Sequence, residues 1–345
     1  MNILITGTNG YIGTKFSEYV KKYNKNNRVS SADHQALTNA PVTAHNSSGS
    51  VNNGNRNITY NVEHISLRDD NWKNADLSNT DVILHTAAIV HRPDLNGPEA
   101  EDIYRSVNVE LTKELAERAV AAGVPHFIFM STMNVYGRSS GTISSSDKPV
   151  PETLYGKTKL QAEKELQRIF GAAGDGFTLT IVRPPMVYGP SCPGNFARLS
   201  KLAVRIPLFP RIKNERSMIY IENLCEFLRL AAVQRLDGIF CPQNDEYVNT
   251  SDLVREIAEA SGHRMLLIPG LNVPLRAAAR RSAVISKIAG TLIYEKDTSI
   301  PFDYNVAGFR ESIKKAPLGV DAAPYRKVRQ FHNRRTIYRP HRREP

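Results

Sequence analysis

The chain begins with the run Ile3-Leu4-Ile5-Thr6-Gly7-Thr8-Asn9-Gly10-Tyr11-Ile12-Gly13, a short apolar strand followed by three glycines spaced three residues apart. Gly7 permits a sharp turn, Gly10 lets a pyrophosphate approach the backbone, and Gly13 lets the next helix pack on the strand. The first N–H groups of that helix and its dipole favour an anion. The spacing GxxGxxG differs from the standard GxGxxG. We interpret the turn as a dinucleotide phosphate site, against the alternative of a glycine turn that binds nothing.

Strands and helices alternate after this turn. We expect further strands at 28–33, 62–67, 82–85, 127–130 and 179–182, and helices from the turn to Lys22, over 99–122 and over 155–170. This order predicts an α/β fold with a Rossmann-type doubly wound parallel sheet. Beyond Pro185 the pattern weakens, and a helix over 222–234, a strand over 239–242 and a helix from Ser251 remain legible.

The weaker pattern of the second half predicts a smaller C-terminal lobe over the carboxyl ends of the strands. We expect a dinucleotide-binding domain at 1–183, to which 218–242 returns, and a substrate lobe made of 184–217 and 243–324. Residues 38–57, rich in Asn, Ser, Gly and Thr, are expected to form a mobile loop. Residues 325–345 are expected to be a disordered basic tail.

The formal net charge of +11 is concentrated at one end of the chain. Residues 326–345 hold eight Lys and Arg against a single acid, so they supply +7 of the total. The remaining 325 residues are therefore not notably basic, and we expect no nucleic-acid partner. The tail could lie on an anionic membrane surface or touch RNA, although a solvated extension is the simpler interpretation.

The other bulk features indicate a globular protein. No apolar run approaches the length needed to span a bilayer, and the N-terminal residues do not resemble a signal peptide. The three cysteines, Cys192, Cys225 and Cys241, form no metal-type cluster. Their odd number favours reduced thiols, so we expect a cytoplasmic protein without a metal.

Tyr155-Gly156-Lys157-Thr158-Lys159 places a phenol and an ammonium on one face of a helix. A phenol with a pKa near 10 is a poor proton acceptor at neutral pH, and a neighbouring cation lowers that pKa. The pair therefore suits proton exchange with an alcohol or ketone. Ser131 and Thr132 lie about two dozen residues upstream of this pair.

Asp33 lies twenty residues beyond Gly13, at the expected end of the second strand. A carboxylate there accepts hydrogen bonds from an adenosine ribose and repels a 2′-phosphate, which favours NAD over NADP. A solvated loop aspartate is the competing interpretation.

Six motifs in order make the chain similar to the extended short-chain dehydrogenase/reductase family, in its NAD-dependent epimerase/dehydratase branch, over about residues 1–318. They are the glycine turn, His85-Thr86-Ala87-Ala88, Ser131-Thr132-Met133-Asn134-Val135-Tyr136-Gly137, Tyr155–Lys159, Arg183-Pro184-Pro185-Met186-Val187-Tyr188-Gly189-Pro190 and Arg216-Ser217-Met218-Ile219-Tyr220-Ile221. Within the branch, the chain resembles proteins related to UDP-glucose 4-epimerase that act in bacterial surface polysaccharide synthesis.

The resemblance implies a role for each matching residue. Thr132 would hydrogen-bond the reacting sugar oxygen, Tyr155 would be the acid/base, and Lys159 would bind the nicotinamide ribose. Asn195 and Arg216 would hold the diphosphate of the substrate, and Met133 would also contact the substrate. The residues implied against NAD are Gly7, Gly10, Tyr11, Ile12, Gly13, Asp33, Leu67, Thr86, Ala87, Ala88, Tyr155, Lys159 and Pro185; Leu67 stands near the position where the family often carries an acid.

Met133 and Asn134 discriminate between reactions. Sugar 4,6-dehydratases of the family carry Asp-Glu there, whereas Met and Asn cannot exchange protons. The resemblance then implies a 4-epimerase acting on UDP-glucose, UDP-galactose or their N-acetyl forms through a transient 4-keto sugar. A UDP-4-keto-6-deoxyhexose reductase that consumes NAD(P)H remains the alternative, and a non-catalytic dinucleotide-binding regulator is the third hypothesis. We also expect a homodimer through the helices at 99–122 and 155–170.

Overall fold

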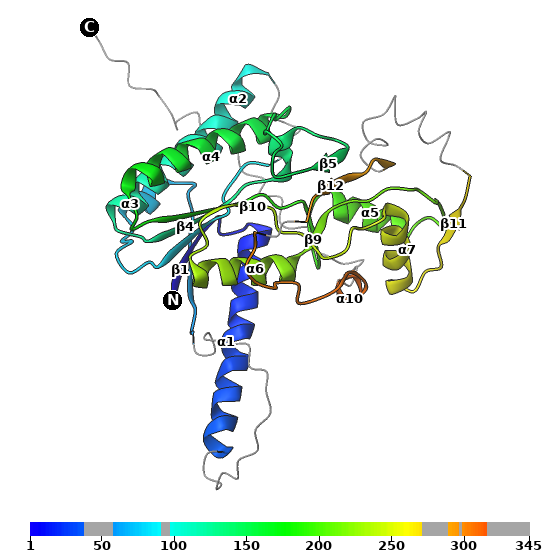
Figure 1. Ribbon diagram of the computed structural model, residues 1–345, viewed down its shortest axis with the longest axis horizontal. Coiled ribbons are helices and arrows are strands. Elements are labelled where there is room, and N and C mark those ends of the chain that lie inside the picture. The colour runs from blue at the N-terminus through cyan, green and yellow to red at the C-terminus, as the bar shows by residue number, and fades with distance from the viewer. Residues whose placement is uncertain (38–57, 91–96, 271–288, 297–298, 316–345) are drawn as a thin grey trace.

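The computed structural model describes residues 1–37, 58–90, 97–270, 289–296 and 299–315 (Figure 1). The predicted loop at 38–57 and the basic tail lie outside this part of the chain. Within the described residues, no helix combines the length and apolar composition needed to cross a bilayer.

Six parallel strands form the central sheet, in the order β10-β6-β4-β3-β1-β2. Their bounds are β1 (Asn2–Thr6), β2 (Asn61–Ile65), β3 (Val82–His85), β4 (His126–Met130), β6 (Thr178–Val182) and β10 (Gly238–Phe240). The chain runs from β1 outward to β2 and then crosses to β3 on the other side of β1. This arrangement confirms the predicted doubly wound α/β fold and puts a topological switch point between β1 and β3.

Helices cover both faces of the sheet, as Figure 1 shows. One face carries α1 (Tyr11–Leu37) and α6 (Ile221–Gln234), and the other carries α3 (Leu111–Ala121) and α4 (Leu154–Ala173). The alternation along β1 explains both layers, because Ile3 and Ile5 join the core cluster under α1 and α6 while Leu4 joins the cluster under α3 and α4.

The predicted strand at 28–33 is wrong, because α1 continues as a helix to Leu37. The place beside β1 is taken by β2, whose five residues pair with all of β1 from Asn2↔Asn61 to Thr6↔Ile65. Residues 28–33 contain one strongly apolar side chain, Val29, so they offer no alternating apolar face for a sheet to bury. The segment predicted as the third strand is therefore the second.

The helix predicted over 99–122 is present but is not uniform. It consists of α2 (Pro98–Arg105), a π-helical turn η2 (Ser106–Glu110) and α3. The extra residue of a π turn rotates the helix surface, and such turns are frequent at functional sites. Here the rotation buries Asn108 completely.

A smaller lobe, built mostly from the second half of the chain, lies beside the central sheet (Figure 1). Its elements are three two-stranded parallel sheets, β5 (Gly141–Ile143) with β12 (Leu292–Tyr294), β7 (Met186–Tyr188) with β9 (Met218–Tyr220) and β8 (Leu208–Pro210) with β11 (Leu266–Ile268), and the helices α5 (Asn195–Ala203), α7 (Thr250–Ala260) and α10 (Phe309–Lys315). Two short 3-10 turns, η1 (Asp70–Asn74) and η3 (Met133–Tyr136), complete the described elements.

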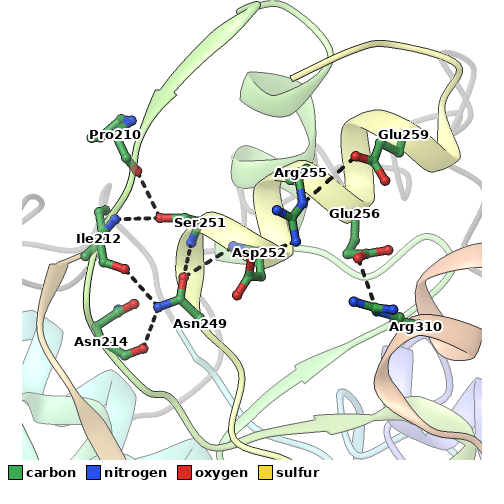
Figure 2. Close-up of polar contacts among 10 residues, drawn as sticks. All are labelled: Pro210, Ile212, Asn214, Asn249, Ser251, Asp252, Arg255, Glu256, Glu259 and Arg310. Atoms are coloured by element: carbon green, nitrogen blue, oxygen red, sulfur yellow. Dashed lines mark hydrogen bonds and ion pairs between the residues drawn. The ribbon is translucent and has the colours of Figure 1, made fainter. Parts of the chain in front are cut away.

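The start of α7 is tied to the segment that follows β8 (Figure 2). Asn249 caps the helix through the N–H groups of Ser251 and Asp252, and its amide donates to the carbonyls of Ile212 and Asn214. The Ser251 hydroxyl accepts from Ile212 N at 2.7 Å and donates to Pro210 O at 2.9 Å. This network fixes β8 against α7.

Candidate functional site

The glycine turn lies at the switch point, packed against the segment that follows β3. Gly7 has φ +90°, and a Cβ on it would stand 3.1 Å from the backbone of Ala87. A Cβ on Gly13 would stand 2.9 Å from Ile5 Cγ2. Both positions therefore need glycine for the turn to pack. The N–H groups of Tyr11 and Ile12 open α1, where the first turn of a helix has no intrahelical acceptors.

Thr86, Ala87 and Ala88 follow β3 and lie beside this glycine turn. The Thr86 hydroxyl donates to Thr6 O at 2.6 Å, so the ends of β1 and β3 are fixed to each other. His85, the first residue of the motif, is buried with Nδ1 2.6 Å from Thr6 Oγ1 and Nε2 2.8 Å from Thr112 Oγ1. Burial lowers the pKa of His85 to about 3, with Lys159 acting in the same direction. His85 is therefore a neutral structural residue.

We expected Asp33 at the end of the second strand. The structure contradicts this position, because Asp33 lies within α1. The strand that ends beside the glycine turn is β2, and Gly7 N donates to Ile65 O at 3.3 Å. Ser66, Leu67 and Arg68 follow it, with Leu67 buried and Arg68 exposed. The segment that leaves β2 beside the glycine turn therefore carries a hydroxyl and a cation, and the first carboxylate after β2, Asp69, caps η1.

The structure brings Thr132 and Tyr155 together. Thr132 precedes η3, and its hydroxyl accepts from Asn134 N at 3.2 Å, so its own proton remains available to an oxygen. Tyr155 lies in the first turn of α4, where Thr153 is the N-cap. Burial raises the pKa of Tyr155 to about 12, and a side-chain hydrogen bond with Thr132 acts in the lowering direction.

Gly156 is the reason that these two segments meet, and the sequence analysis did not single it out. A Cβ on Gly156 would stand 2.6 Å from the carbonyl oxygen of Asn134. The first turn of α4 thus touches the backbone of η3. The glycine within Tyr155–Lys159 was the available signal.

Lys159 is fully enclosed, at 1% exposure, one helical turn from Tyr155. Its Nζ lies 3.8 Å from the centroid of the Phe129 ring, a cation–π contact. Burial lowers the pKa of Lys159 to about 7, and the charge of Glu163 acts against that change. The expected lowering of the Tyr155 pKa by Lys159 is not found, because burial of the phenol outweighs every favourable interaction.

A buried ion pair lies behind Lys159. Arg183, at the end of β6, directs Nε and Nη2 to the two oxygens of Glu163 at 3.1 and 2.5 Å. The Ser131 hydroxyl donates to the same carboxylate, and Arg183 Nη1 donates to the Tyr136 hydroxyl at 2.9 Å. Sequence reasoning missed Glu163, although its position four residues after Lys159 was a usable signal.

Asn108 is a second residue that sequence reasoning missed. Its amide donates to Ile89 O at 3.0 Å and to Thr158 Oγ1 at 3.1 Å, and its oxygen accepts from Ile89 N at 2.8 Å. It thereby joins the segment after β3 to the Tyr155–Lys159 turn of α4. A polar residue inside a long predicted helix does not by itself indicate that it connects two other segments.

The remaining candidate residues lie on the neighbouring segments. Met133 N donates to Pro184 O at 3.0 Å, which holds η3 against the buried Pro185. Asn195 is the exposed first residue of α5. Arg216 bridges Val248 and Leu292 through its backbone, and its Nη1 donates to Gly290 O at 2.9 Å. Asn195 and Arg216 thus belong to the smaller lobe, on different elements from the Tyr155 group.

The residues present fit a dinucleotide at the switch point. The glycine cradle and the opening N–H groups of α1 suit a pyrophosphate, and the Thr86–Ala88 segment leads from it toward the α4 site. Lys159, Tyr155 and Thr132 offer a cation and two hydroxyls at the other end. The arrangement can exchange one proton with a carbinol placed beside Tyr155.

Known proteins are similar to this chain over most of its length. The model of the NAD dependent epimerase/dehydratase family matches residues 3–239. The UDP-glucose 4-epimerase of Vibrio cholerae is 29% identical over 314 residues, which cover 84% of this chain and 86% of the relative. An N-acetyl-alpha-D-glucosaminyl-diphospho-ditrans,octacis-undecaprenol 4-epimerase of Escherichia coli O157:H7 is 25% identical over 278 residues, 79% of this chain and 75% of the relative.

Solved structures share the fold at lower identity. MoeE5 in complex with UDP-glucose and NAD superposes with a TM-score of 0.61 at 20% identity, covering 91% of this chain and 97% of that one. The UDP-glucuronic acid 4-epimerase from Bacillus cereus in complex with NAD gives 0.60 at 20% identity, covering 92% and 97%.

Proposed function

The chain belongs to the NAD-dependent epimerase/dehydratase family, with NAD as its cofactor, and on that premise we propose that it is a UDP-hexose 4-epimerase of surface polysaccharide synthesis. The observation that carries the proposal is the contact of Thr132 with Tyr155 one helical turn from Lys159, without an acid at Met133 or Asn134. The relatives named UDP-glucose 4-epimerase and lipid-diphosphate N-acetylglucosamine 4-epimerase support the reaction at C4 and leave the C2 substituent open.

The chemistry of the side chains follows from their positions. NAD, when bound, supplies the acceptor and donor of a hydride. Tyr155 takes the proton of the C4 hydroxyl and returns it to the ketone oxygen, while the Thr132 hydroxyl donates a hydrogen bond to that oxygen. Lys159, one helical turn from Tyr155, is the residue that we assign to the nicotinamide ribose. Met133 and Asn134 hold no proton donor for the elimination of water, so the 4-keto sugar is not dehydrated.

We assign the substrate diphosphate to the smaller lobe. Arg216 offers a guanidinium, which pairs with phosphate through two parallel N–H groups, and Asn195 offers an amide at the start of α5. The enzyme is proposed to act in the cytoplasm, where nucleotide sugars are made available to it.

Purified full-length protein tests the proposal. It should interconvert UDP-glucose with UDP-galactose, or the two N-acetyl forms, without added cofactor, and Tyr155→Phe should abolish the conversion. Stoichiometric consumption of added NADH or NADPH with a UDP-4-keto-6-deoxyhexose would instead identify a reductase. If no UDP-sugar reacts with or without cofactor, the epimerase assignment is wrong.

We further propose that the enzyme is a homodimer through α2, α3 and α4. Ile103 keeps an exposed apolar side chain on α2, which a partner would cover. Sedimentation at micromolar concentration measures this directly, and a monomer there would contradict it.

A further inference from the structure

The two-stranded sheet of β8 and β11 is apolar on both faces. Phe209 and Leu267, which are register partners, face the main core. Leu208 and Leu266 are also register partners and stand on the opposite face, 48% and 64% exposed. The two strands are parallel, and parallel sheets normally have both faces covered. The exposed leucines therefore indicate that another molecule covers the outer face in the functioning protein.

The inner side of this sheet is already occupied. Pro210 O and Ile212 N both bond the Ser251 hydroxyl at the start of α7, which closes the core side of β8 (Figure 2). Figure 1 places β11 at the far edge of the smaller lobe, away from the central sheet. Leu202, 38% exposed near the end of α5, adds a third apolar side chain six residues before Leu208.

The stretch of sequence that contains Leu202 and Leu208 is rich in cations. Residues 195–215 carry one acid, Glu215, and five cations, Arg198, Lys201, Arg205, Arg211 and Lys213, all exposed. None of the five forms an ion pair within the described residues. The segment thus holds a net charge of +4, equal to that of the whole chain outside residues 326–345. The exposed Leu202 and Leu208 therefore lie in a stretch of sequence with a clear excess of positive charge.

The positive charge of residues 195–215 discriminates between the molecules that could cover the outer face of β8–β11. A second copy would bring the same positive surface, and the segment directly after β11, residues 271–288, contains Arg276, Arg280, Arg281 and Lys287 without an acid. Like charges disfavour both. A nucleic acid would match the charge but would leave the leucines in water. An anionic lipid surface matches both features, because apolar side chains enter the acyl boundary while cations meet the headgroups.

We propose that the outer face of β8–β11, with Leu202 and the flanking cations of α5 and of residues 211–213, docks on an anionic membrane. The surface shares α5 with Asn195 and so lies on the lobe assigned to the substrate diphosphate. Docking would bring that lobe to the membrane at which surface glycans are assembled. The surface does not depend on the epimerase assignment, since it contains none of the proposed catalytic residues.

Vesicle flotation tests this with the full-length protein. Vesicles of phosphatidylcholine with about one third phosphatidylglycerol should bind it, and pure phosphatidylcholine should not. Leu208→Ser with Leu266→Ser should weaken binding by about tenfold or more. Val150→Ser, a 68% exposed apolar residue elsewhere, is the matched control and should bind as the wild type does.

A second pair of variants keeps the test independent of folding. Lys201→Glu with Arg205→Glu changes only exposed side chains and should also lose binding, whereas Lys164→Glu on α4 should not. If the leucine and charge-reversal variants bind like the wild type, another part of the chain binds the vesicles and the proposal is overturned. It is equally overturned if the leucine variants only convert a dimer into a monomer.

Discussion

Gly156, in the first turn of α4, lies against Asn134 so closely that a Cβ would stand 2.6 Å from the Asn134 carbonyl oxygen. Backbone cannot yield as a flexible side chain does, so an added methyl group would push α4 away from η3. Because Tyr155 precedes Gly156 and Thr132 precedes η3, this contact sets how the proposed acid/base meets the proposed hydroxyl donor.

Gly156→Ala should therefore lower kcat by roughly 10–100-fold, since small displacements of reacting groups are costly. Gly171→Ala is the control, because it lies in the same helix with nothing within 4 Å of a Cβ. The control should gain about 0.5–1 kcal/mol of stability and keep full activity. Equal activity of the two variants in steady-state assays would show that the contact does not position Tyr155.

Tyr155→Phe should reduce turnover by about 10²–10⁴-fold, because it removes the proton exchange and little else. Thr132→Val should cost less, since a hydrogen bond is lost but the phenol remains. Thr132 also caps η3, so its variant needs a melting curve beside the rate measurement. Tyr155→Phe should melt as the wild type does; a large drop in Tm would mean that the activity loss reports misfolding.

Lys159 should destabilise the free protein at neutral pH. Its folded pKa of about 7 lies below the ordinary lysine value of 10.5, so the unfolded chain binds more protons between these values. Stability from this group therefore rises with pH through that window, and the penalty is complete below it. Lys159→Met should stabilise the protein at pH 7 by roughly 1–4 kcal/mol and abolish activity.

The control for Lys159→Met is the pH dependence of the stability difference between the variant and the wild type. Urea unfolding at pH 7 and at a pH above 10.5 should show the advantage of the variant shrinking at the higher value, where the lysine is neutral in both states. An advantage independent of pH would assign the effect to packing against Phe129 rather than to charge.

Glu163→Gln tests the buried ion pair. The variant leaves Arg183 enclosed without its carboxylate, which typically costs about 3–5 kcal/mol. It also removes the charge that raises the pKa of Lys159, so any limb of the pH–rate profile that belongs to Lys159 should move to lower pH. Denaturant unfolding measures the first effect, and kcat/KM against pH measures the second. A stability loss with an unmoved profile would make Glu163 a structural residue only.

The parts of the site that were predictable from sequence are local ones. The glycine turn and the Tyr155–Lys159 helix face each follow from spacing within one element, and the structure places them as expected. Glu163–Arg183 and Gly156–Asn134 are contacts across 20 and 22 residues, which exist only once α4 lies over β4 and β6. No spacing rule predicts them.

The wrong strand prediction at 28–33 has a different cause. The expectation counted residues from the glycine turn and assumed a short first helix, but α1 runs 27 residues and the next strand of the sheet begins at Asn61. The position twenty residues beyond Gly13 therefore lies within α1 and not at the end of a strand. The residues that do follow β2 are Ser66, Leu67 and Arg68.

This correction yields a prediction about the ribose end of the cofactor. Asp33→Asn should leave the Kd for NAD unchanged, because Asp33 lies within α1 and not at the end of a strand beside the glycine turn. Arg68→Glu should weaken NADP binding by about tenfold or more and change NAD binding much less, since a carboxylate at this end repels a 2′-phosphate. Fluorescence titration of the two cofactors on both variants measures this without turnover. A loss of NAD affinity in Asp33→Asn would restore Asp33 to the site and show that residues 66–68 do not form it.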